Sequence, residues 1–352
     1  MTYKITLLPG DGIGPEITQV ARAVLEHTAS LSGFSVKFTE CAFGGASIDQ
    51  YGEPLTDKTL KACQSADAVF LGAVGGPKWD HAPERPEMGL LALRKALGVY
   101  ANLRPAAVHP ALADKSPLRP DLVAGTDVLI VRELTGGIYF GERERSEDKA
   151  SDKCTYTRAE IERVARVAFE QARLRRGKLT SVDKANVLET SKLWRAVVTE
   201  MGQRDFPDIE LDHMYVDAAA MHMLRHPASF DVMVTENMFG DILSDEASML
   251  PGSIGLLGSA SLGDQRPGLF EPIHGSAPDI AGQDKANPFG AIEAAAQLLE
   301  SLDEIDAAKR VRAAVNAMHE AGEWTGDLGG SLTCSEAGVK LVERLERQAV
   351  AA

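Results

Sequence analysis

Short apolar runs alternate along this chain with longer segments that have helical apolar spacing. The apolar runs predict strands at residues 3–8, 34–40, 68–74, 126–132, 179–183, 214–217 and 230–235. Helical spacing predicts helices at residues 15–31, 87–97 and 157–175, in the segment around residue 241, and in three amphipathic segments after residue 287. This alternation of strands and helices predicts an α/β architecture.

The loop between the first strand and the first helix carries Gly10, Gly12 and Gly14 at alternate positions. This spacing differs from the Gly-x-Gly-x-x-Gly pattern of dinucleotide-binding Rossmann loops. We interpret the loop as a glycine turn that permits close packing, or close approach of the backbone to a ligand. A glycine pair, Gly75-Gly76, follows the third strand, where open α/β sheets often bind ligands, although a simple turn also explains it.

The composition is that of a globular protein with room for two domains or one large α/β unit: 352 residues, 44% of them hydrophobic. A formal charge of −14 argues against nucleic acid and anionic membrane surfaces as partners. Neither a signal peptide nor a membrane-spanning apolar run is recognisable, so we expect a cytoplasmic protein. The cysteines are widely spaced, which disfavours a disulfide framework and a zinc site: Cys41, Cys63, Cys154 and Cys334.

Two acidic residues, Asp241 and Asp245, lie four positions apart in a segment with helical spacing. At that spacing both carboxylates share one helix face. Like charges so close repel each other unless a cation or a basic partner lies between them. The pair therefore marks a candidate site for a hard divalent cation, although a solvated helix face is the commoner explanation of such a pair taken alone.

The helix predicted at residues 87–97 places Leu90 and Leu91 one turn before Arg94, on the same side. A guanidinium beside two leucines could bind a carboxylate whose carbon skeleton carries an apolar branch. From this helix alone, an amphipathic helix with an arginine at its rim is the favoured interpretation.

Further polar residues follow predicted strands or glycine turns, and together they suit metal-assisted chemistry on a small polycarboxylate. Arginine clamps carboxylates with paired hydrogen bonds, aspartate binds Mg²⁺ or Mn²⁺, and lysine and tyrosine exchange protons. Each also has a purely structural explanation, as a surface residue, a packed aromatic or a helix cap. The candidates are Arg104, Arg132, Tyr139, Lys184 and Asp217. The charged tract at residues 142–153 is interpreted as a solvated loop, and Thr157 with Glu160 as a capping box that opens a helix.

Four longer motifs occur in a characteristic order: Arg132-Glu-Leu-Thr-Gly-Gly-Ile-Tyr-Phe-Gly, Asp183-Lys-Ala-Asn-Val-Leu-Glu, Asn237-Met-Phe-Gly-Asp-Ile-Leu-Ser-Asp-Glu and His274-Gly-Ser-Ala-Pro-Asp-Ile-Ala-Gly. With them the chain resembles the isocitrate/isopropylmalate dehydrogenase family of β-decarboxylating dehydrogenases over nearly its whole length. The resemblance implies a two-domain α/β fold that is not a Rossmann fold. It also implies a first, cofactor-side domain of residues 1–99 plus 252–352, and a second domain of residues 100–251 that carries the dimer interface.

The resemblance also implies roles for individual residues. The substrate would contact Leu90, Leu91, Arg94, Arg104, Arg132 and Asp217. The metal would be held by Asp217, Asp241 and Asp245, and the catalytic residues would be Tyr139 and Lys184. Lys184 and Asp217 would reach into the site of the partner subunit of a homodimer. NAD would contact Gly75, Gly76, Pro77, Glu87, Asn186, His274, Gly275, Ser276, Ala277, Pro278, Asp279 and Asn287.

The implied reaction is the NAD-dependent oxidative decarboxylation of 3-isopropylmalate to 2-oxo-4-methylpentanoate and CO₂ in leucine biosynthesis, with Mg²⁺ or Mn²⁺. Lys184 would remove the C2 hydroxyl proton, and Tyr139 would protonate carbon after CO₂ leaves. We expect NAD rather than NADP, because Asp279 can accept hydrogen bonds from ribose hydroxyls but repels a 2′-phosphate.

Three alternatives remain open at this point. A sister enzyme could act on isocitrate, homoisocitrate, tartrate or D-malate, but those relatives typically have Arg-Glu-Asn-Thr-Glu where this chain has Arg132-Glu-Leu-Thr-Gly, and they lack the paired leucines. A metal-dependent phosphoryl transferase is disfavoured because the phosphate-binding pattern Gly-x-x-x-x-Gly-Lys-Ser/Thr is absent from the sequence. A non-catalytic dicarboxylate-binding protein would explain the arginines but has no need of both Lys184 and Tyr139.

Overall fold

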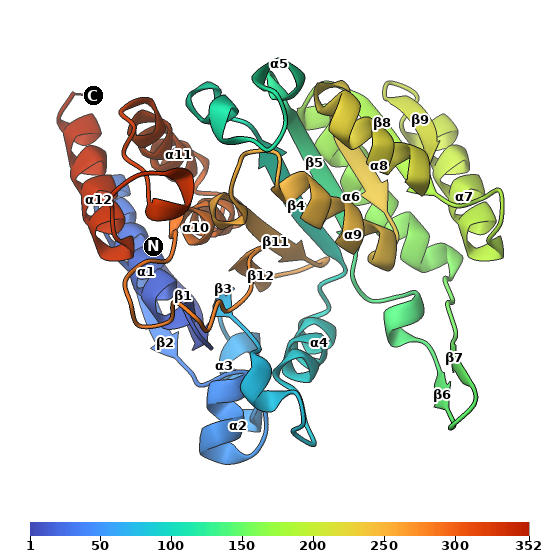
Figure 1. Cartoon of the computed structure of the whole chain (residues 1–352), viewed down its shortest axis with the longest axis horizontal. Helices are drawn as coiled ribbons and strands as arrows, with labels where there is room; N and C mark the ends of the chain where they lie inside the picture. Colours follow the sequence, from blue (N-terminus) through green and yellow to red (C-terminus); the bar gives the residue numbers. More distant parts are fainter. Residues whose placement is uncertain (352) are drawn as a thin grey trace. The chain divides into compact units, whose positions relative to one another are not determined.

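The computed structural model describes residues 1–351, with side chains to residue 347. The chain forms two compact units: Met1–Val99 with Ser253–Ala352 (unit 1), and Tyr100–Gly252 (unit 2). Figure 1 shows helices packed around strands in both units. This arrangement confirms the predicted α/β fold class.

Unit 1 contains five strands in the spatial order β2-β1-β3-β12-β11. They are β1 (Thr2–Gly10), β2 (Ser35–Glu40), β3 (Ala68–Ala73), β11 (Gly258–Leu262) and β12 (Gly268–Pro272). The first four in this spatial order are parallel, and β11 pairs antiparallel with β12. Every residue of β3 is buried, as the continuous apolar run predicts.

The described part of unit 1 contains seven α-helices: α1 (Gly14–Ser32), α2 (Gly45–Tyr51), α3 (Asp57–Gln64), α4 (Pro86–Leu97), α10 (Phe289–Ser301), α11 (Ile305–Glu320) and α12 (Cys334–Ala351). The helix α1 begins with Pro15 in its first turn and buries one apolar face, including Ile17, Val24 and Leu25. It packs against α10, α11 and α12. The three predicted C-terminal helices are confirmed.

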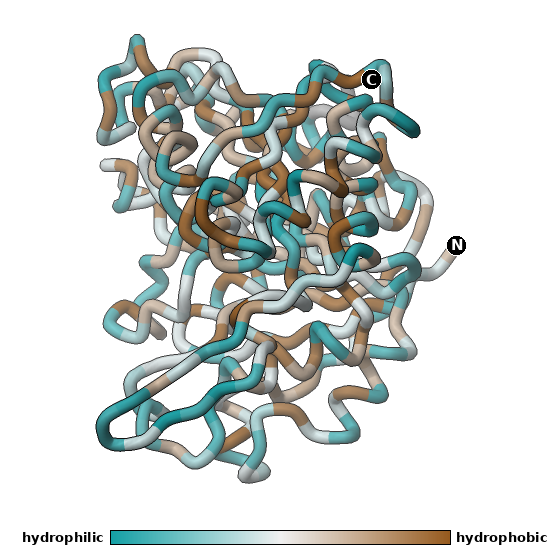
Figure 2. The backbone as a smooth tube through the Cα atoms, turned by 90° about the vertical axis from the view of Figure 1, so that its right-hand side faces the viewer, coloured by the Kyte–Doolittle hydropathy of each residue, from teal (hydrophilic) through white to brown (hydrophobic). Residues whose placement is uncertain are grey.

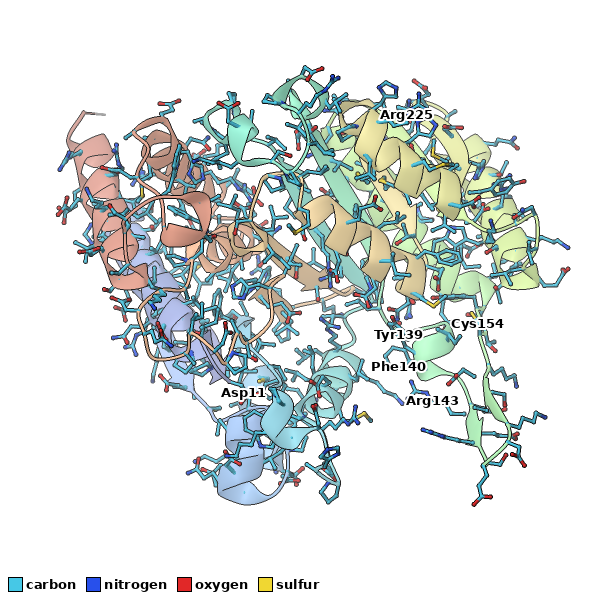
Figure 3. All side chains as sticks on the ribbon, viewed as in Figure 1. Asp11, Tyr139, Phe140, Arg143, Cys154 and Arg225 are labelled. Atoms are coloured by element: carbon cyan, nitrogen blue, oxygen red, sulfur yellow. The ribbon has the colours of Figure 1, made fainter. Side chains whose placement is uncertain are left out.

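The glycine turn between β1 and α1 allows its backbone to pack closely against neighbouring backbone, which is one of the two interpretations drawn from the sequence. Gly10 and Gly12 have positive φ, and a Cβ atom at either would lie 1.9 Å from a backbone oxygen, of Ala73 or Ser276 respectively. Asp11, between them, is buried and accepts hydrogen bonds from the backbone N–H groups of Gly45, Ala46 and Gly75 at 2.7–2.9 Å. Its carboxylate therefore ties the turn to the start of α2 and to the loop after β3; Figure 3 labels Asp11.

Unit 2 contributes five of its strands to the large sheet, in the spatial order β4-β5-β10-β8-β9. They are β4 (Ala101–Ala107), β5 (Asp127–Glu133), β8 (Lys178–Asp183), β9 (Glu210–Tyr215) and β10 (Val232–Thr235). All neighbouring pairs are parallel except β4 with β5. Its helices are α5 (Pro120–Val123), α6 (Arg158–Leu174), α7 (Glu189–Asp205), α8 (Val216–Arg225) and α9 (Asn237–Ser248).

The helices of unit 2 pack in pairs, α6 with α7 and α8 with α9, and each pair contacts the strands. The predicted capping box opens α6: the Thr157 hydroxyl accepts from the Glu160 N–H, and the Glu160 carboxylate accepts from the Thr157 N–H.

Figure 2 shows hydrophobic and hydrophilic residues alternating along helical turns, as expected of helices with one buried face.

Several elements differ from the predictions. Strands β4, β11 and β12 were not predicted. Strand β4 carries the polar residues Asn102 and Arg104 and a proline, β11 lies in a glycine-rich stretch, and β12 is a short segment that contains a glutamate and a proline. The charged tract is exposed as expected, but it is not a simple loop. It pairs as an antiparallel hairpin of β6 (Arg143–Arg145) and β7 (Ala150–Asp152).

The predicted strand at residues 214–217 is also corrected. Strand β9 ends at Tyr215, and Asp217 lies in the first turn of α8. An acidic side chain at this position interacts favourably with the positive end of the helix dipole, which favours a helix start here.

The short 3₁₀ turns are η1 (Pro77–Trp79), η2 (Pro110–Lys115), η3 (Ile138–Phe140), η4 (Pro227–Ser229), η5 (Ile254–Leu256) and η6 (Gly326–Leu328). Across residues 1–351, no helix is both long enough and apolar enough to cross a membrane. All four cysteines are free thiols, as the sequence predicted.

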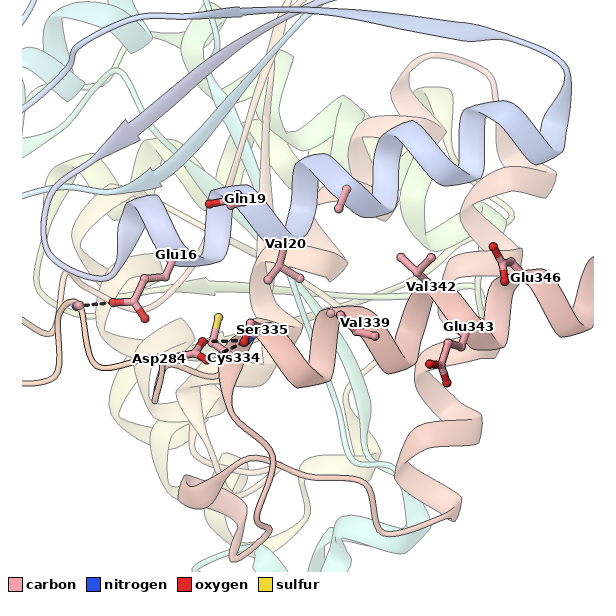
Figure 4. Close-up of a pocket in the computed structure, with 13 residues that line it drawn as sticks. Glu16, Gln19, Val20, Asp284, Cys334, Ser335, Val339, Val342, Glu343 and Glu346 are labelled. Atoms are coloured by element: carbon pink, nitrogen blue, oxygen red, sulfur yellow. Dashed lines mark hydrogen bonds between the residues drawn. The ribbon is translucent and has the colours of Figure 1, made fainter.

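A cavity of about 670 Å³ lies between α1 and α12 in unit 1. Figure 4 shows Val20 of α1 facing Val339 and Val342 of α12, with the carboxylates of Glu16 and Glu343 nearby. Among the described residues that line it, none is a predicted site residue. The candidate chemistry therefore lies elsewhere.

Candidate functional site

Two buried arginines of unit 2 meet the acidic pair on α9. Arg104, on β4, donates from Nη1 to Ser244 Oγ (2.8 Å) and Asp245 Oδ1 (3.2 Å), and its Nη2 lies 4.0 Å from Asp241 Oδ1. Arg132, at the end of β5, donates from Nη1 to the same Asp241 oxygen. The helix α9 places both carboxylates on one face, as the four-residue spacing predicted.

Arg132 is fixed by the first residue of α9. Its Nε and Nη2 donate to the Asn237 side-chain oxygen at 3.2 and 2.8 Å, and Nε also donates to the Asn237 backbone oxygen at 3.0 Å. Several hydrogen bonds to one residue leave the planar guanidinium little freedom. The guanidinium of Arg132 is therefore held in one orientation beside α9.

Tyr139 completes this cluster from the turn η3, where Figure 3 labels it. Its hydroxyl donates to Asp241 Oδ2 at 3.1 Å, and its ring lies 5.9 Å from the Arg132 guanidinium carbon. Burial, together with the negative charge of Asp241, raises the pKa of the Tyr139 hydroxyl. Tyr139 therefore keeps its proton at neutral pH and can act as a proton donor.

The acidic pair retains accessible oxygens beside the two arginines. The Asp241 side chain is 34% exposed and that of Asp245 is 63% exposed. Partial burial raises the pKa of Asp245, and the Arg104 charge opposes that rise. Accessible carboxylate oxygens on one helix face are suitable ligands for a hard divalent cation.

Asp217 does not join this pair within one chain. Among the described residues, no group of three or more His, Cys, Asp or Glu side chains is placed to hold a metal ion. Asp217 instead accepts a hydrogen bond from Lys184 Nζ at 2.5 Å, and this hydrogen bond lowers the pKa of its carboxyl. Lys184 directly follows β8, as predicted, and Asn186 lies exposed in the next turn.

In unit 1, Arg94 is buried on α4 and donates from Nη2 to Glu271 Oε1 of β12 at 2.7 Å. Its Nε atom is buried and has no hydrogen-bond partner among the described groups. Leu90 is half-buried against the apolar core around Leu93, and Leu91 is half-buried beside it on the same helix. The predicted combination of one guanidinium and two leucines on α4 therefore exists.

A second cluster of unit 1 surrounds the Gly75-Gly76 turn. A Cβ atom at Gly75 would lie 2.5 Å from Glu87 Oε1, and one at Gly76 would lie 3.9 Å from Ser276 Oγ. The Ile13 N–H donates to the backbone carbonyl oxygen of Ser276 at 2.8 Å. The first glycine turn therefore adjoins the segment that contains Ser276. The loop that follows β3, the start of α4 and the segment 274–279 thus meet.

His274 carries a polar atom that the described residues leave unpaired. Burial lowers the pKa of its imidazole, Nδ1 lies 2.9 Å from the Gly275 oxygen, and Nε2 is buried without a partner. A neutral ring with an unpaired nitrogen can bind a ligand's hydrogen-bonding edge. The Asp279 side chain nearby in sequence is exposed, as are Gly275 and Pro278.

Asn287 is engaged by its own chain. It donates from Nδ2 to Asp327 at 2.9 Å, and its Oδ1 accepts from the Phe289 N–H at 2.9 Å, at the start of α10. These bonds fix the side-chain amide, so any contact with a ligand would use its remaining hydrogen-bonding capacity.

Residues 4–341 match the model of the isocitrate/isopropylmalate dehydrogenase family. The chain belongs to this family. It is 61% identical over 330 residues to a 3-isopropylmalate dehydrogenase of Salinibacter ruber, covering 93% of this chain and 90% of that protein. It is 54% identical over 338 residues to the 3-isopropylmalate dehydrogenase of Staphylococcus saprophyticus, and the alignment covers 96% of this chain and 97% of that protein.

Solved structures of the family have the same fold. An isocitrate dehydrogenase from Methylococcus capsulatus aligns with a TM-score of 0.88 at 38% identity, covering 97% of this chain and 99% of that one. A β-decarboxylating dehydrogenase from Thermococcus kodakarensis aligns with a TM-score of 0.82 at 38% identity, covering 98% and 96%. The predicted family fold is thus confirmed, and dehydrogenases of this family use a nucleotide cofactor and a divalent metal.

Sequence reasoning missed the residues that hold several candidate side chains and loops in place. Asn237 binds Arg132, Glu271 pairs with Arg94, and Asp11 ties the first glycine turn to its neighbours. Asn237 and Glu271 lie inside quoted or adjacent motifs, so their position in those motifs was an available signal. The buried Asp11 could have been noticed as a charged residue inside a glycine turn.

Proposed function

We propose that this chain is the NAD-dependent dehydrogenase of leucine biosynthesis that converts 3-isopropylmalate to 2-oxo-4-methylpentanoate and CO₂. The observation that carries the proposal is the 61% and 54% identity to 3-isopropylmalate dehydrogenases over nearly full length, against 38% to the isocitrate dehydrogenase. The half-buried Leu90 and Leu91 support it, since an apolar surface suits an isopropyl group and not a third carboxylate. A sister enzyme for isocitrate, homoisocitrate, tartrate or D-malate is the less favoured alternative.

Carboxylate recognition falls to Arg94, Arg104 and Arg132. Arg104 and Arg132 are buried and already oriented by Ser244 and Asn237, so little entropy is lost when they bind the malate carboxylates. Their hydrogen bonds to the acidic pair keep both guanidinium groups facing the face of α9 that would receive the substrate. Arg94 would supply a third guanidinium.

The accessible oxygens of Asp241 and Asp245 fit Mg²⁺ or Mn²⁺, and Asp217 of a partner subunit would supply a third carboxylate. When bound, the divalent cation polarises the substrate's C2 oxygen and stabilises negative charge on it. The neighbouring arginines limit the charge repulsion between these acids in the absence of the cation.

The nucleotide fits the second cluster of unit 1. The unpaired His274 Nε2 and the backbone of residues 275–278 would contact the adenosine half, with Asn287 nearby. Glu87 and the Gly75-Gly76-Pro77 turn, together with Asn186, would lie toward the nicotinamide, which accepts hydride from C2 of the substrate. The exposed Asp279 carboxylate favours ribose hydroxyls and repels a 2′-phosphate, so the cofactor is NAD rather than NADP.

Proton transfer is assigned to Lys184 and Tyr139. Lys184, supplied by the partner subunit, takes the C2 hydroxyl proton as hydride leaves C2. After CO₂ departs from the neighbouring carbon, the Tyr139 hydroxyl gives that carbon its proton. The raised pKa of Tyr139 is consistent with this role, because the group arrives at the step protonated.

The active unit is a cytoplasmic homodimer in this proposal. The helices α8 and α9, with the residue that follows α9, expose large apolar side chains, which are costly to leave in water and suit a second copy of the chain: Met221, Leu224, Ile242 and Met249. Because Lys184 and Asp217 do not join the acidic pair within one chain, a shared site explains how all these groups come to act together.

The test is NADH formation from 3-isopropylmalate, Mg²⁺ and NAD⁺, run beside isocitrate, D-malate and an NADP⁺ control. Turnover of 3-isopropylmalate with NAD⁺ that stops on addition of chelator is the expected result. Turnover of another 2-hydroxy acid alone would retain the chemistry but overturn the role of Leu90 and Leu91. Inactivity on every substrate would overturn the proposal.

A further inference from the structure

A buried polar centre lies behind the loop that carries Tyr139. It consists of Glu133 at the end of β5, Glu236 at the start of α9, and Tyr156 just before α6, all of them buried. Burial raises the pKa of both carboxyls and of the tyrosine hydroxyl. Buried polar groups are costly unless hydrogen-bonded, so the bonds within this centre constrain the surrounding backbone.

The Tyr156 hydroxyl links the two carboxylates. It donates toward Glu236 Oε2 at 3.2 Å and toward Glu133 Oε2 at 3.4 Å, and it accepts the Asn237 N–H at 3.0 Å. A hydroxyl has a single proton, so the two acceptors share one donor. This one atom therefore connects the end of β5 with the first residue of α9.

The carboxylates extend the same connection to the backbone on both sides. Glu133 accepts from the N–H groups of Thr135 and Gly136, both at 2.8 Å, and so fixes the start of the Tyr139 loop. Glu236 accepts from the Phe239 N–H at 2.6 Å, which caps the helix that carries Asp241.

The Tyr156 ring packs against the same loop. A Cβ atom at Gly136 would lie 2.6 Å from the ring, and one at Gly137 would lie 2.4 Å from its hydroxyl oxygen. Glycine is therefore required at both positions for the loop to lie on the ring. The Tyr156 ring also packs edge to face against the ring of Trp194, with 5.6 Å between the ring centroids.

We propose that Tyr156 is a positioning residue, which holds the Tyr139 loop and the start of α9 in one fixed arrangement so that the Tyr139 hydroxyl stays directed at its target. The consequence for the reaction rests on the proposed function, whereas the structural connection does not. Tyr156 acts through Tyr139 and touches neither substrate nor cofactor. Its loss should therefore slow turnover without a matching loss of substrate affinity.

The test compares Tyr156→Phe, which keeps the ring and removes the hydroxyl, with the matched control Tyr3→Phe. Tyr3 is also buried, and its hydroxyl also donates to a glutamate, Glu304, at 2.9 Å, but it lies on β1 and contacts no proposed site residue. We expect Tyr156→Phe to lower kcat per folded subunit by roughly tenfold with little change in KM, because small misplacements of reacting groups have effects of this size or larger. Tyr3→Phe should leave both constants unchanged.

Two further readouts separate positioning from simple destabilisation. In a Tyr139→Phe background, adding Tyr156→Phe should lower kcat less than about twofold, since the group through which it acts is already gone. Hydrogen exchange followed by mass spectrometry should show faster exchange at the amides of Thr135 and Gly136 in Tyr156→Phe, and not in Tyr3→Phe. Should Tyr156→Phe fail to fold, Glu236→Gln tests the same hydrogen-bond connection. We expect Glu236→Gln also to lower kcat and to speed amide exchange in the loop.

Equal losses of kcat in both backgrounds, or loss fully explained by the unfolded fraction, would overturn the proposal. Unchanged exchange at the loop amides would overturn its structural part. Absence of wild-type activity on 3-isopropylmalate would instead overturn the proposed function, while the exchange experiment would still decide whether Tyr156 holds the loop.

Discussion

At the scale of single residues, the candidate site is a set of charged groups whose partners come from distant parts of the sequence. Arg132 is oriented by Asn237, 105 positions later, and Arg94 by Glu271, 177 positions later. The spacing of Asp241 and Asp245 could be interpreted locally, because a helix brings positions four apart together. The partners of the arginines could not be identified from local spacing, because only the tertiary fold brings them close to the arginines.

The proton-donor role of Tyr139 leads to a prediction for Tyr139→Phe. This change should lower kcat by roughly a hundredfold or more, since a positioned general acid contributes at least that much, while KM for 3-isopropylmalate changes little. Steady-state kinetics of NADH formation and of CO₂ release measure both constants. Unchanged turnover would remove Tyr139 from the mechanism.

The apolar surface of α4 leads to a second prediction. Replacing Leu90 and Leu91 with threonine should lower kcat/KM for 3-isopropylmalate relative to malate by roughly ten- to a hundredfold, because an apolar pocket discriminates by a few kcal/mol. Leu97, also half-buried against the same core, provides the control, and Leu97→Thr should leave the ratio unchanged. Equal losses on both substrates would contradict the assignment of this pocket.

At the scale of whole elements, prediction succeeded where one local signal dominated. The continuous apolar run of β3 and the capping box of α6 are examples. Strand β4 was missed because its buried polar side chains, such as Arg104, serve the candidate site and break the apolar pattern of a strand. Asp217 was misplaced by a local ambiguity, since strand β9 passes directly into α8 at Val216.

The capping box provides a prediction at this scale. Thr157→Ala removes the hydroxyl that accepts the Glu160 N–H and should lower the free energy of unfolding by about 1 kcal/mol. Urea denaturation measures this loss. Thr157→Ser, which retains the hydroxyl, should recover most of it, and equal destabilisation by both changes would show that the cap contributes little.

At the scale of the whole molecule, one chain does not bring together all the groups that we assign to the proposed reaction. Lys184 pairs with Asp217, while Asp241 and Asp245 contact the arginines, and the described residues contain no three-carboxylate metal group. The family resemblance implied this separation, because it places Lys184 and Asp217 in the site of a partner subunit, but the residue patterns by themselves did not indicate it. The exposed apolar side chains of α8 and α9 form the surface that we propose for a second copy.

A subunit-mixing experiment decides whether the site is shared. Lys184→Ala and Asp241→Asn should each be nearly inactive as pure dimers. In a hybrid dimer, the Lys184→Ala subunit retains its own Asp241 and receives Lys184 from its partner, so one intact site forms, and the other site carries both defects. Unfolding and refolding an equal mixture produces about half hybrids, so activity should return to about a quarter of the wild-type value. A mixture that stays inactive, although hybrids are demonstrated by native mass spectrometry, would place Lys184 and Asp241 in the same chain's site and exclude the shared arrangement.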